Sequence, residues 1–283
     1  MPQRIDAHHH LWRYSTAQYG WISEAMPQLR RDFLSRELDE ALHEGQMEGA
    51  VAVQARQTIE ETNWLLALAT ASPRMLGVVG WAPIASPEFA GMLEELAAQP
   101  KLKGLRHIIQ DEPNDDFILG HDFNAGIALL KNTGLVYDVL IFEKHLPQTI
   151  KFVDRHAQQR FVLDHIAKPR IKAGLLSPWQ ENIRELARRP NVYCKLSGML
   201  TEADWQHWTP ETLRPYVETV LEAFGPQRLM FGSDWPVCLL AASYKKWAQT
   251  VEELIASLSV NEKQRVMGGT ADEVYRLTTT NQT

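Results

Sequence analysis

Residues 49–56 read GAVAVQAR, and residues 58–71 read TIEETNWLLALATA. The first stretch is short and almost continuously apolar, which is typical of a parallel β-strand covered on both faces. The second opens with a Thr and two Glu and then carries three Leu residues, which predicts a helix. Together they form one strand–helix unit, and the fold depends on how often this unit recurs.

The same succession recurs along the whole chain. Eight candidate strands are expected at residues 4–10, 49–56, 75–82, 104–110, 135–141, 161–166, 192–198 and 229–234. Further helices are expected at 86–98, which opens with Ser-Pro-Glu as an N-cap, and at 178–188 and 210–224, which both start with Pro. Eight strands alternating with helices predict an α/β fold, a single (β/α)8 TIM-type barrel. A doubly wound open sheet remains the alternative, because the strand count alone does not show closure.

Composition and charge narrow the class of protein. Of 283 residues, 45% are hydrophobic and 23% charged, as in a globular protein, and no Gly-, Ser- or Pro-rich linker divides the chain. We expect one domain over residues 1–283, with a frayed polar tail at 278–283. The net charge of −6 argues against nucleic-acid binding. No apolar run reaches about 18 residues, so no membrane-spanning segment is expected. The two cysteines fit no disulfide framework, and the N-terminus shows no signal-peptide pattern, so a cytoplasmic protein is expected.

The irregular stretch 11–32 carries four aromatic residues and is expected to be an ordered, functional loop. The chain shows no glycine-rich phosphate loop, so nucleotide binding has no support.

The clearest chemical signal is IDAHHH at residues 5–10. Side chains alternate along a strand, so His8 and His10 are expected on one face and His9 on the other. At the mouth of a barrel, two imidazoles on one face can share a ligand, a water or a metal ion. A surface run of histidines is the alternative.

Two further strands are expected to end in chemically active residues. The run FVLDH ends in His165, and LMFGSD ends in Asp234, just before Pro236. The carboxyl ends of barrel strands form the face where barrel active sites are built. A carboxylate that accepts a proton from water, beside histidines that bind a metal or orient a carbonyl, suits water attack on a polarised carbonyl. A buried structural His and a turn or N-cap Asp remain the alternatives.

These residues and their surroundings resemble the amidohydrolase superfamily, and in particular its sugar-lactonase branch. The resemblance runs from residue 4 to about 277, and the blocks that carry it are 5–14, 104–107, 110–113, 162–165, 168–169, 194–198 and 231–237. It implies hydrolysis of a small sugar lactone, such as an L-fuconolactone-like aldonolactone, to the aldonic acid. A metal-dependent decarboxylase of a small carboxylic acid, within the same superfamily, is the alternative, followed by a non-catalytic binding protein.

The residues also allow expectations about metal and substrate. His8, His10, His165 and Asp234 would supply three nitrogens and one oxygen, a set that suits one divalent metal, with zinc the first choice. The expected fourth and fifth strands offer no Lys or Glu that would bridge two metals, and the resemblance implies that activity need not require the metal. Candidate substrate-binding residues, each of which could instead be structural, are Gln54, Arg56, Arg106, His107, Lys195 and Trp235. The expected partner is a small sugar lactone, and the pattern predicts no particular oligomeric state.

Overall fold

A computed structural model describes residues 3–278. Its eight strands form one parallel sheet in the order of the sequence, and each pairs with the next. They are β1 (Ile5–His9), β2 (Gly49–Val53), β3 (Met75–Gly80), β4 (Leu102–Ile108), β5 (Val136–Leu140), β6 (Phe161–Leu163), β7 (Val192–Leu196) and β8 (Leu229–Phe231). The predicted (β/α)8 barrel is confirmed, with all eight expected strands present.

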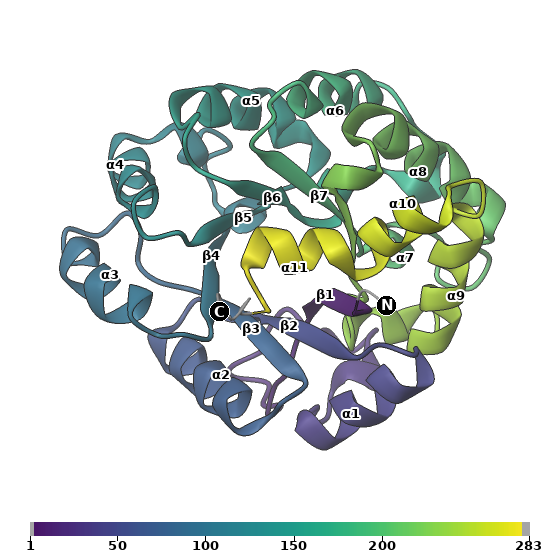
Figure 1. The fold of residues 1–283 in the computed structure, drawn as a ribbon, viewed down its shortest axis with the longest axis horizontal. Coiled ribbons are helices and arrows are strands. Elements are labelled where there is room, and N and C mark those ends of the chain that lie inside the picture. Colours follow the sequence, from purple (N-terminus) through teal and green to yellow (C-terminus); the bar gives the residue numbers. More distant parts are fainter. Residues whose placement is uncertain (1–2, 279–283) are drawn as a thin grey trace.

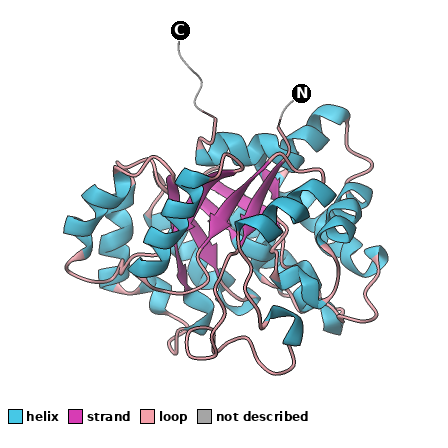
Figure 2. Cartoon of the chain, turned by 90° about the horizontal axis from the view of Figure 1, so that it is seen from below, coloured by secondary structure: helices cyan, strands magenta, loops and turns pink. Residues whose placement is uncertain are grey.

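Helices surround the strands, and α11 lies across one end of the barrel (Figures 1 and 2). The helices are α1 (Ser35–Glu44), α2 (Ile59–Ala71), α3 (Phe89–Ala97), α4 (His121–Leu130), α5 (Leu146–Arg155), α6 (Trp179–Ala187), α7 (Met199–Glu202), α8 (Pro210–Phe224), α9 (Tyr244–Leu254), α10 (Val260–Gln264) and α11 (Thr270–Tyr275). Helix α8 has the predicted bounds. Helix α3 starts at Phe89, so the N-cap predicted at Ser86 is wrong: residues 86–88 form a turn that the Phe89 N–H closes on the Ser86 carbonyl.

Strand β8 ends at Phe231, so the prediction that Asp234 ends this strand is wrong. The backbone of Asp234 takes a left-handed φ of 54°, outside the strand region. Its N–H nevertheless donates to the carbonyl of His8 at 2.8 Å, and the N–H of His10 donates to the carbonyl of Trp235 at 2.6 Å. These bonds close the barrel between its first strand and the segment after its last, which excludes the open-sheet alternative.

Strand β1 carries an irregularity that positions its histidines. Asp6 pairs with Ala50 of β2, and His9 pairs with Ala52, so β1 has one extra residue between these points. Such a bulge re-aims side chains and is common next to active sites. Ile5 and Ala7 therefore join the inner apolar cluster, while His8 and His10 both reach the site described below.

Two apolar clusters support the barrel. The larger lies between the strands and the surrounding helices, and the smaller fills the barrel and contacts α11. Members of the smaller cluster are Ile5, Ala7, Val51, Val53, Val79, Val136, Val162, Met230, Ala271, Val274, Tyr275 and Leu277. The C-terminal helix therefore closes the end of the barrel opposite the site.

The loop and tail predictions can be placed on this fold. Segment 11–32 is tied to the body by backbone hydrogen bonds between Trp12 and Phe33, and Trp12 is fully buried. Thr278 donates to Asp272, while the rest of the predicted frayed tail, 279–283, lies outside the described residues. Between residues 3 and 278, no helix combines the length and the apolar character needed to span a membrane.

Candidate active site

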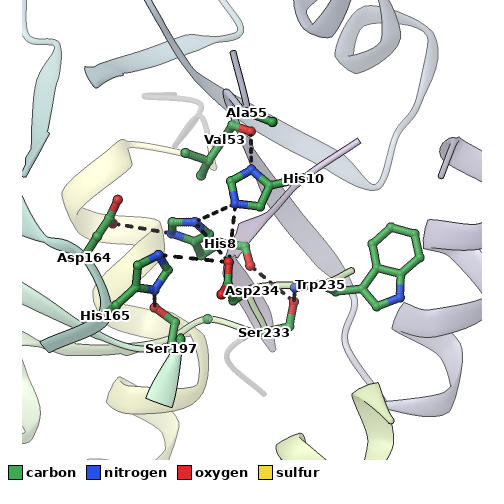
Figure 3. Close-up of polar contacts among 12 residues, drawn as sticks. His8, His10, Val53, Ala55, Asp164, His165, Ser197, Ser233, Asp234 and Trp235 are labelled. Carbon is green, nitrogen blue, oxygen red and sulfur yellow. Dashed lines mark hydrogen bonds and ion pairs between the residues drawn. The ribbon is translucent and has the colours of Figure 1, made fainter. Parts of the chain in front are cut away.

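The four residues expected to carry the chemistry lie together at the carboxyl end of the strands (Figure 3). The Nε2 atoms of His8 and His10 are 3.1 Å apart. The Oδ1 atom of Asp234 lies 3.3 Å from His10 Nε2, 3.7 Å from His8 Nε2 and 4.0 Å from His165 Nε2. One carboxylate oxygen therefore faces three imidazole nitrogens, two from the end of β1 and one from the turn after β6.

The hydrogen bonds of His10 decide which of its nitrogens is free. Its Nδ1 lies 2.8 Å from the carbonyl oxygen of Val53, which only accepts, so this nitrogen is assigned the proton. The other ring nitrogen, Nε2, then faces Nε2 of His8 and Oδ1 of Asp234. Histidine metal ligands are commonly oriented by this kind of bond from the second ring nitrogen.

His165 is the second residue after strand β6 and lies in a turn with a left-handed φ of 53°, so it does not end the strand as predicted. Its Nδ1 is 2.8 Å from the hydroxyl of Ser197. Gly198, with a φ of 63°, packs against the imidazole so closely that a Cβ there would lie 2.5 Å from Cγ of His165. Only a glycine combines this backbone conformation with this close approach.

A buried carboxylate holds the loop that carries Asp234. Asp6 accepts hydrogen bonds from the backbone N–H groups of His8 and Ser233, at 3.0 and 2.8 Å, and from the hydroxyls of Ser233 and Tyr244, at 2.6 and 2.9 Å. Burial raises the pKa of Asp6 to about 6 despite these donors. Sequence reasoning missed this role, although an Asp inside an otherwise apolar strand was the available signal.

A second network of buried charges lies beneath His8. The ammonium of Lys195 is 2.5 Å from Asp138, 3.0 Å from Asp164 and 3.2 Å from Nδ1 of His8. Arg106 donates to Asp164 at 2.9 Å and lies 3.4 Å from Nε2 of His8. Two cations and two carboxylates thus balance inside the barrel, as buried charges require. Asp138 and Asp164 were not predicted as site residues; an Asp directly before His165 was the signal for the second.

The surroundings set the charge of each group. Burial, reinforced by Lys195, holds the pKa of His8 well below its usual value, and burial lowers the pKa of His165 to about 4. Burial would raise the pKa of Asp234, but His165 and His10 outweigh it and keep that pKa below its usual range. At neutral pH the site therefore offers the ionised carboxylate of Asp234 beside the neutral imidazoles of His8 and His165, which suits proton transfer and metal binding.

A cavity of about 340 Å³ opens onto these groups. His10, His165, Asp234 and Arg106 are in its wall. Of the six candidate substrate-binding residues, Arg106 alone lines this cavity, within the described part of the chain. Its guanidinium is already paired with Asp164, so it presents a fixed cation beside His8.

The other five candidates make protein contacts instead. Gln54 donates to the Arg106 carbonyl at 3.4 Å, and Arg56 lies 3.8 Å from Glu61. His107 is 2.6 Å from a carboxylate oxygen of Glu112. Lys195 is fully buried in the charge network, and Trp235 packs edge-on against Phe33.

Several residues of the cavity wall were not predicted. They include Gln110, Asp111, Phe142, Lys168, Glu202 and Trp205. They lie after the ends of β4, β5, β6 and β7. The available signal was that Gln110, Asp111 and Lys168 belong to blocks that carry the family resemblance. Trp21, one of the four aromatic residues of segment 11–32, also lines the cavity.

The donor set fits one divalent metal ion. Atoms bound at about 2.0–2.2 Å around a tetrahedral ion lie roughly 3.3–3.6 Å apart. The nitrogen and oxygen atoms of His8, His10 and Asp234 are separated by 3.1 to 3.7 Å, close to this spacing. A second possible group contains Asp164, but its carboxylate is already engaged by Lys195 and Arg106.

Comparison with known proteins places this geometry in a family. A family model described as amidohydrolase matches residues 5–277. The L-fucono-1,5-lactonase of Burkholderia multivorans is 44% identical to this chain, covering 97% of the chain and 96% of its own length. The L-fucono-1,5-lactonase of Burkholderia ambifaria is 36% identical, covering 98% and 97%.

A solved structure agrees with this placement. The crystal structure of an amidohydrolase from Burkholderia multivorans with bound zinc superposes with a TM-score of 0.94 at 44% identity, covering 98% of this chain and 100% of that one. The resemblance read from the strand-end motifs is thereby confirmed over nearly the full length. The chain belongs to the amidohydrolase family.

Proposed function

We propose that this protein is a lactonase that opens a small sugar lactone, of the L-fucono-1,5-lactone type, to its aldonic acid. The observation that carries the proposal is the carboxylate of Asp234 facing His8, His10 and His165 at one end of a cavity. The names of the two Burkholderia relatives support the substrate class. The decarboxylase alternative gains no observation of its own from the site.

In the proposed mechanism Asp234 is the general base. It removes a proton from a water molecule while the water oxygen forms a bond to the carbonyl carbon of the lactone. Negative charge develops on the former carbonyl oxygen, and the cation of Arg106 in the cavity wall stabilises it. His165, in the same wall, positions the water or the carbonyl by a hydrogen bond. The tetrahedral species then collapses, the ring C–O bond breaks, and the proton on Asp234 passes to the leaving alkoxide. Product release leaves Asp234 ionised again.

The proposal includes a metal ion held by His8, His10, His165 and Asp234, and zinc is the proposed ion. When bound, it supplies Lewis-acid polarisation at this end of the cavity. We propose that activity does not depend on it, because Arg106 already places a cation beside His8 and because a lactone is more easily hydrolysed than an amide. We also propose that the chain forms one domain. We propose further that the protein acts in the cytoplasm, and cell fractionation tests this location.

A panel of aldonolactones, followed with a pH indicator, tests the activity. We expect L-fucono-1,5-lactone to be opened well above its spontaneous rate. Asp234→Asn should lower kcat by about 10²–10⁴-fold, the usual contribution of a general base. Asp122→Asn is the matched control, because Asp122 is exposed and its one ion-pair partner among residues 3–278 is the neighbouring His121. The proposal fails if no lactone is accelerated, and carbon dioxide release from a small carboxylic acid would favour the decarboxylase.

A further inference from the structure

The turn after strand β6 is strained. Four consecutive residues, His165 to Lys168, have positive φ values of 53°, 48°, 63° and 48°, and none of them is glycine. Left-handed backbone costs roughly 1–2 kcal/mol for each such residue. Strain of this kind persists only where the surrounding structure enforces it, and it concentrates at functional sites. The turn therefore calls for a function beyond joining β6 to the next helix.

The turn places two side chains, His165 and Lys168, in the wall of the same cavity. The ammonium of Lys168 lies 5.5 Å from the ring centroid of Phe142. Within the described chain, no carboxylate lies within 4.0 Å of this ammonium. Its charge nevertheless acts on two carboxyl groups: it contributes to the lowered pKa of Asp234 and offsets part of the rise that burial causes in the pKa of Glu202. Lys168 is thus a cation that faces the cavity without an ion-pair partner.

Two other polar groups of the wall are similarly available. Glu202, at the end of α7, lies within 4.0 Å of no Lys, Arg or His nitrogen that the structure describes, and burial raises its pKa. The Oε1 atom of Gln110 is buried and has no hydrogen-bond partner among residues 3–278. Buried polar groups without partners are costly, so such groups mark a place where a ligand can supply the missing bonds.

We infer that Lys168, Glu202 and Gln110 are the residues that recognise the hydroxyl groups of the substrate. A hydroxyl both donates and accepts, so neighbouring hydroxyls on a sugar ring can accept from the ammonium and donate to the carboxylate or to the amide oxygen. This assignment, which rests on the proposed lactonase activity, names three specificity-determining residues on the loops after β4, β6 and β7.

The charges of the wall also define which lactones fit. Lys168 is its one cation without an ion pair among the described residues, since Arg106 is held by Asp164. Three acidic side chains, Asp111, Glu202 and Asp234, face the same space. A carboxylate on the substrate would face three acidic side chains and only one unpaired cation, so it would be repelled. The preferred substrate is therefore a neutral polyhydroxy lactone and not an acid-bearing one.

Paired substrates separate hydroxyl recognition from chemistry. L-fucono-1,5-lactone carries ring hydroxyls, whereas δ-valerolactone has the same ring size and none. We expect Lys168→Met and Glu202→Gln each to lower kcat/KM for the sugar lactone by about 10- to 100-fold, mainly through KM, as expected for lost charged hydrogen bonds. Turnover of δ-valerolactone should change by less than about threefold, because only uniform binding of the hydroxyls is removed.

The matched control is Lys172→Met. Lys172 is 71% exposed, pairs with Asp204 at 3.2 Å and lies outside the cavity wall, so kcat/KM should be unchanged for both lactones. Lys168→Arg should restore part of the loss on the sugar lactone. An equal loss on both lactones would overturn the assignment, because Lys168 or Glu202 would then act on the carbonyl or on folding. Unchanged kinetics on both lactones would overturn it as well.

Binding of L-fucose, which has the hydroxyls but no lactone carbonyl, separates this inference from the proposed function. Calorimetry should show binding to the unmodified protein and at least tenfold weaker binding to Lys168→Met. If the unmodified protein binds L-fucose in this way but hydrolyses no lactone, the proposed function fails and hydroxyl recognition stands. If it hydrolyses the lactone but the variants match it, hydroxyl recognition alone fails. If the protein neither hydrolyses a lactone nor binds L-fucose, both the proposed function and the hydroxyl recognition fail.

Discussion

Replacing Gly198 by Ala tests whether the position of His165 controls activity. A Cβ at residue 198 would lie 2.5 Å from Cγ of His165, where an ordinary contact is at least 3.4 Å. The imidazole, which is also held by the hydroxyl of Ser197, must then retreat by about 1 Å or tilt. The substitution thus moves one of the three imidazoles around Asp234 without removing it.

The magnitude has two separable parts. Ala at a φ of 63° costs about 1–2 kcal/mol of backbone strain, which lowers Tm by roughly 2–4 °C for each kcal/mol in a protein of this size. Displacement of a catalytic group by about 1 Å costs about 100-fold in rate. We therefore expect kcat/KM to fall by about 100-fold while the protein stays folded at 25 °C.

Gly174→Ala is the matched control, because Gly174 has a φ of 65° and a Cβ there would meet nothing within 4 Å. It should show the same strain in urea unfolding and retain full lactonase activity. Crystallography or the ring proton shifts of His165 would show the displacement directly. If Gly198→Ala remains as active as Gly174→Ala, the placement of His165 is not required for the reaction, and the role given to it here is refuted.

Three further outcomes are expected. Tyr275→Phe removes the hydroxyl that donates to both carboxylate oxygens of buried Asp138 at 2.9 Å, and should lower the free energy of unfolding in urea by about 1–3 kcal/mol. Burial lowers the pKa of His107 below 6.5, so the unfolded chain binds more protons than the folded one, and the free energy of unfolding falls as the pH drops from 7.5 to 5. His107→Gln should reduce the difference in unfolding free energy between these two pH values. Protein loaded with zinc should hold one equivalent by mass spectrometry, and His10→Ala clearly less; two tightly held equivalents would contradict the single site.

The number and order of the strands could be predicted from sequence because both faces of each strand are covered. Runs such as 49–56 are apolar for that reason, and they stand out from the helices between them. The strand ends could not be predicted in the same way. Strands β6 and β8 stop at Leu163 and Phe231, and left-handed backbone follows each of them, at Ile166 and at Asp234. A β-branched Ile does not favour this conformation, so its sequence gives no sign of the turn.

The chemical centre was accessible to sequence reasoning, because His8, His10, His165 and Asp234 follow apolar strands that converge at one end. The cavity wall was not. The predicted substrate-binding residues Lys195 and His107 are instead paired with the carboxylates of Asp138 and Glu112. No sequence rule predicts an ion pair between two different strands, or between a strand and the loop that follows it. Lys168 faces the cavity only because of the left-handed turn, and Glu202 because a short helix follows β7. These positions depend on tertiary structure.

The closing helix α11 has a consequence for how this chain is made. Tyr275 contacts Asp138, which precedes it by 137 residues, and α11 also packs on β1 and β8. A ribosome adds about 5–20 residues per second from the N-terminus, so Asp138 emerges many seconds before its partner. Until then the inner apolar cluster and a buried carboxylate are open to water at one end. The nascent barrel is therefore a substrate for chaperones and proteases through most of its synthesis, and a product shortened before Tyr275 would remain one.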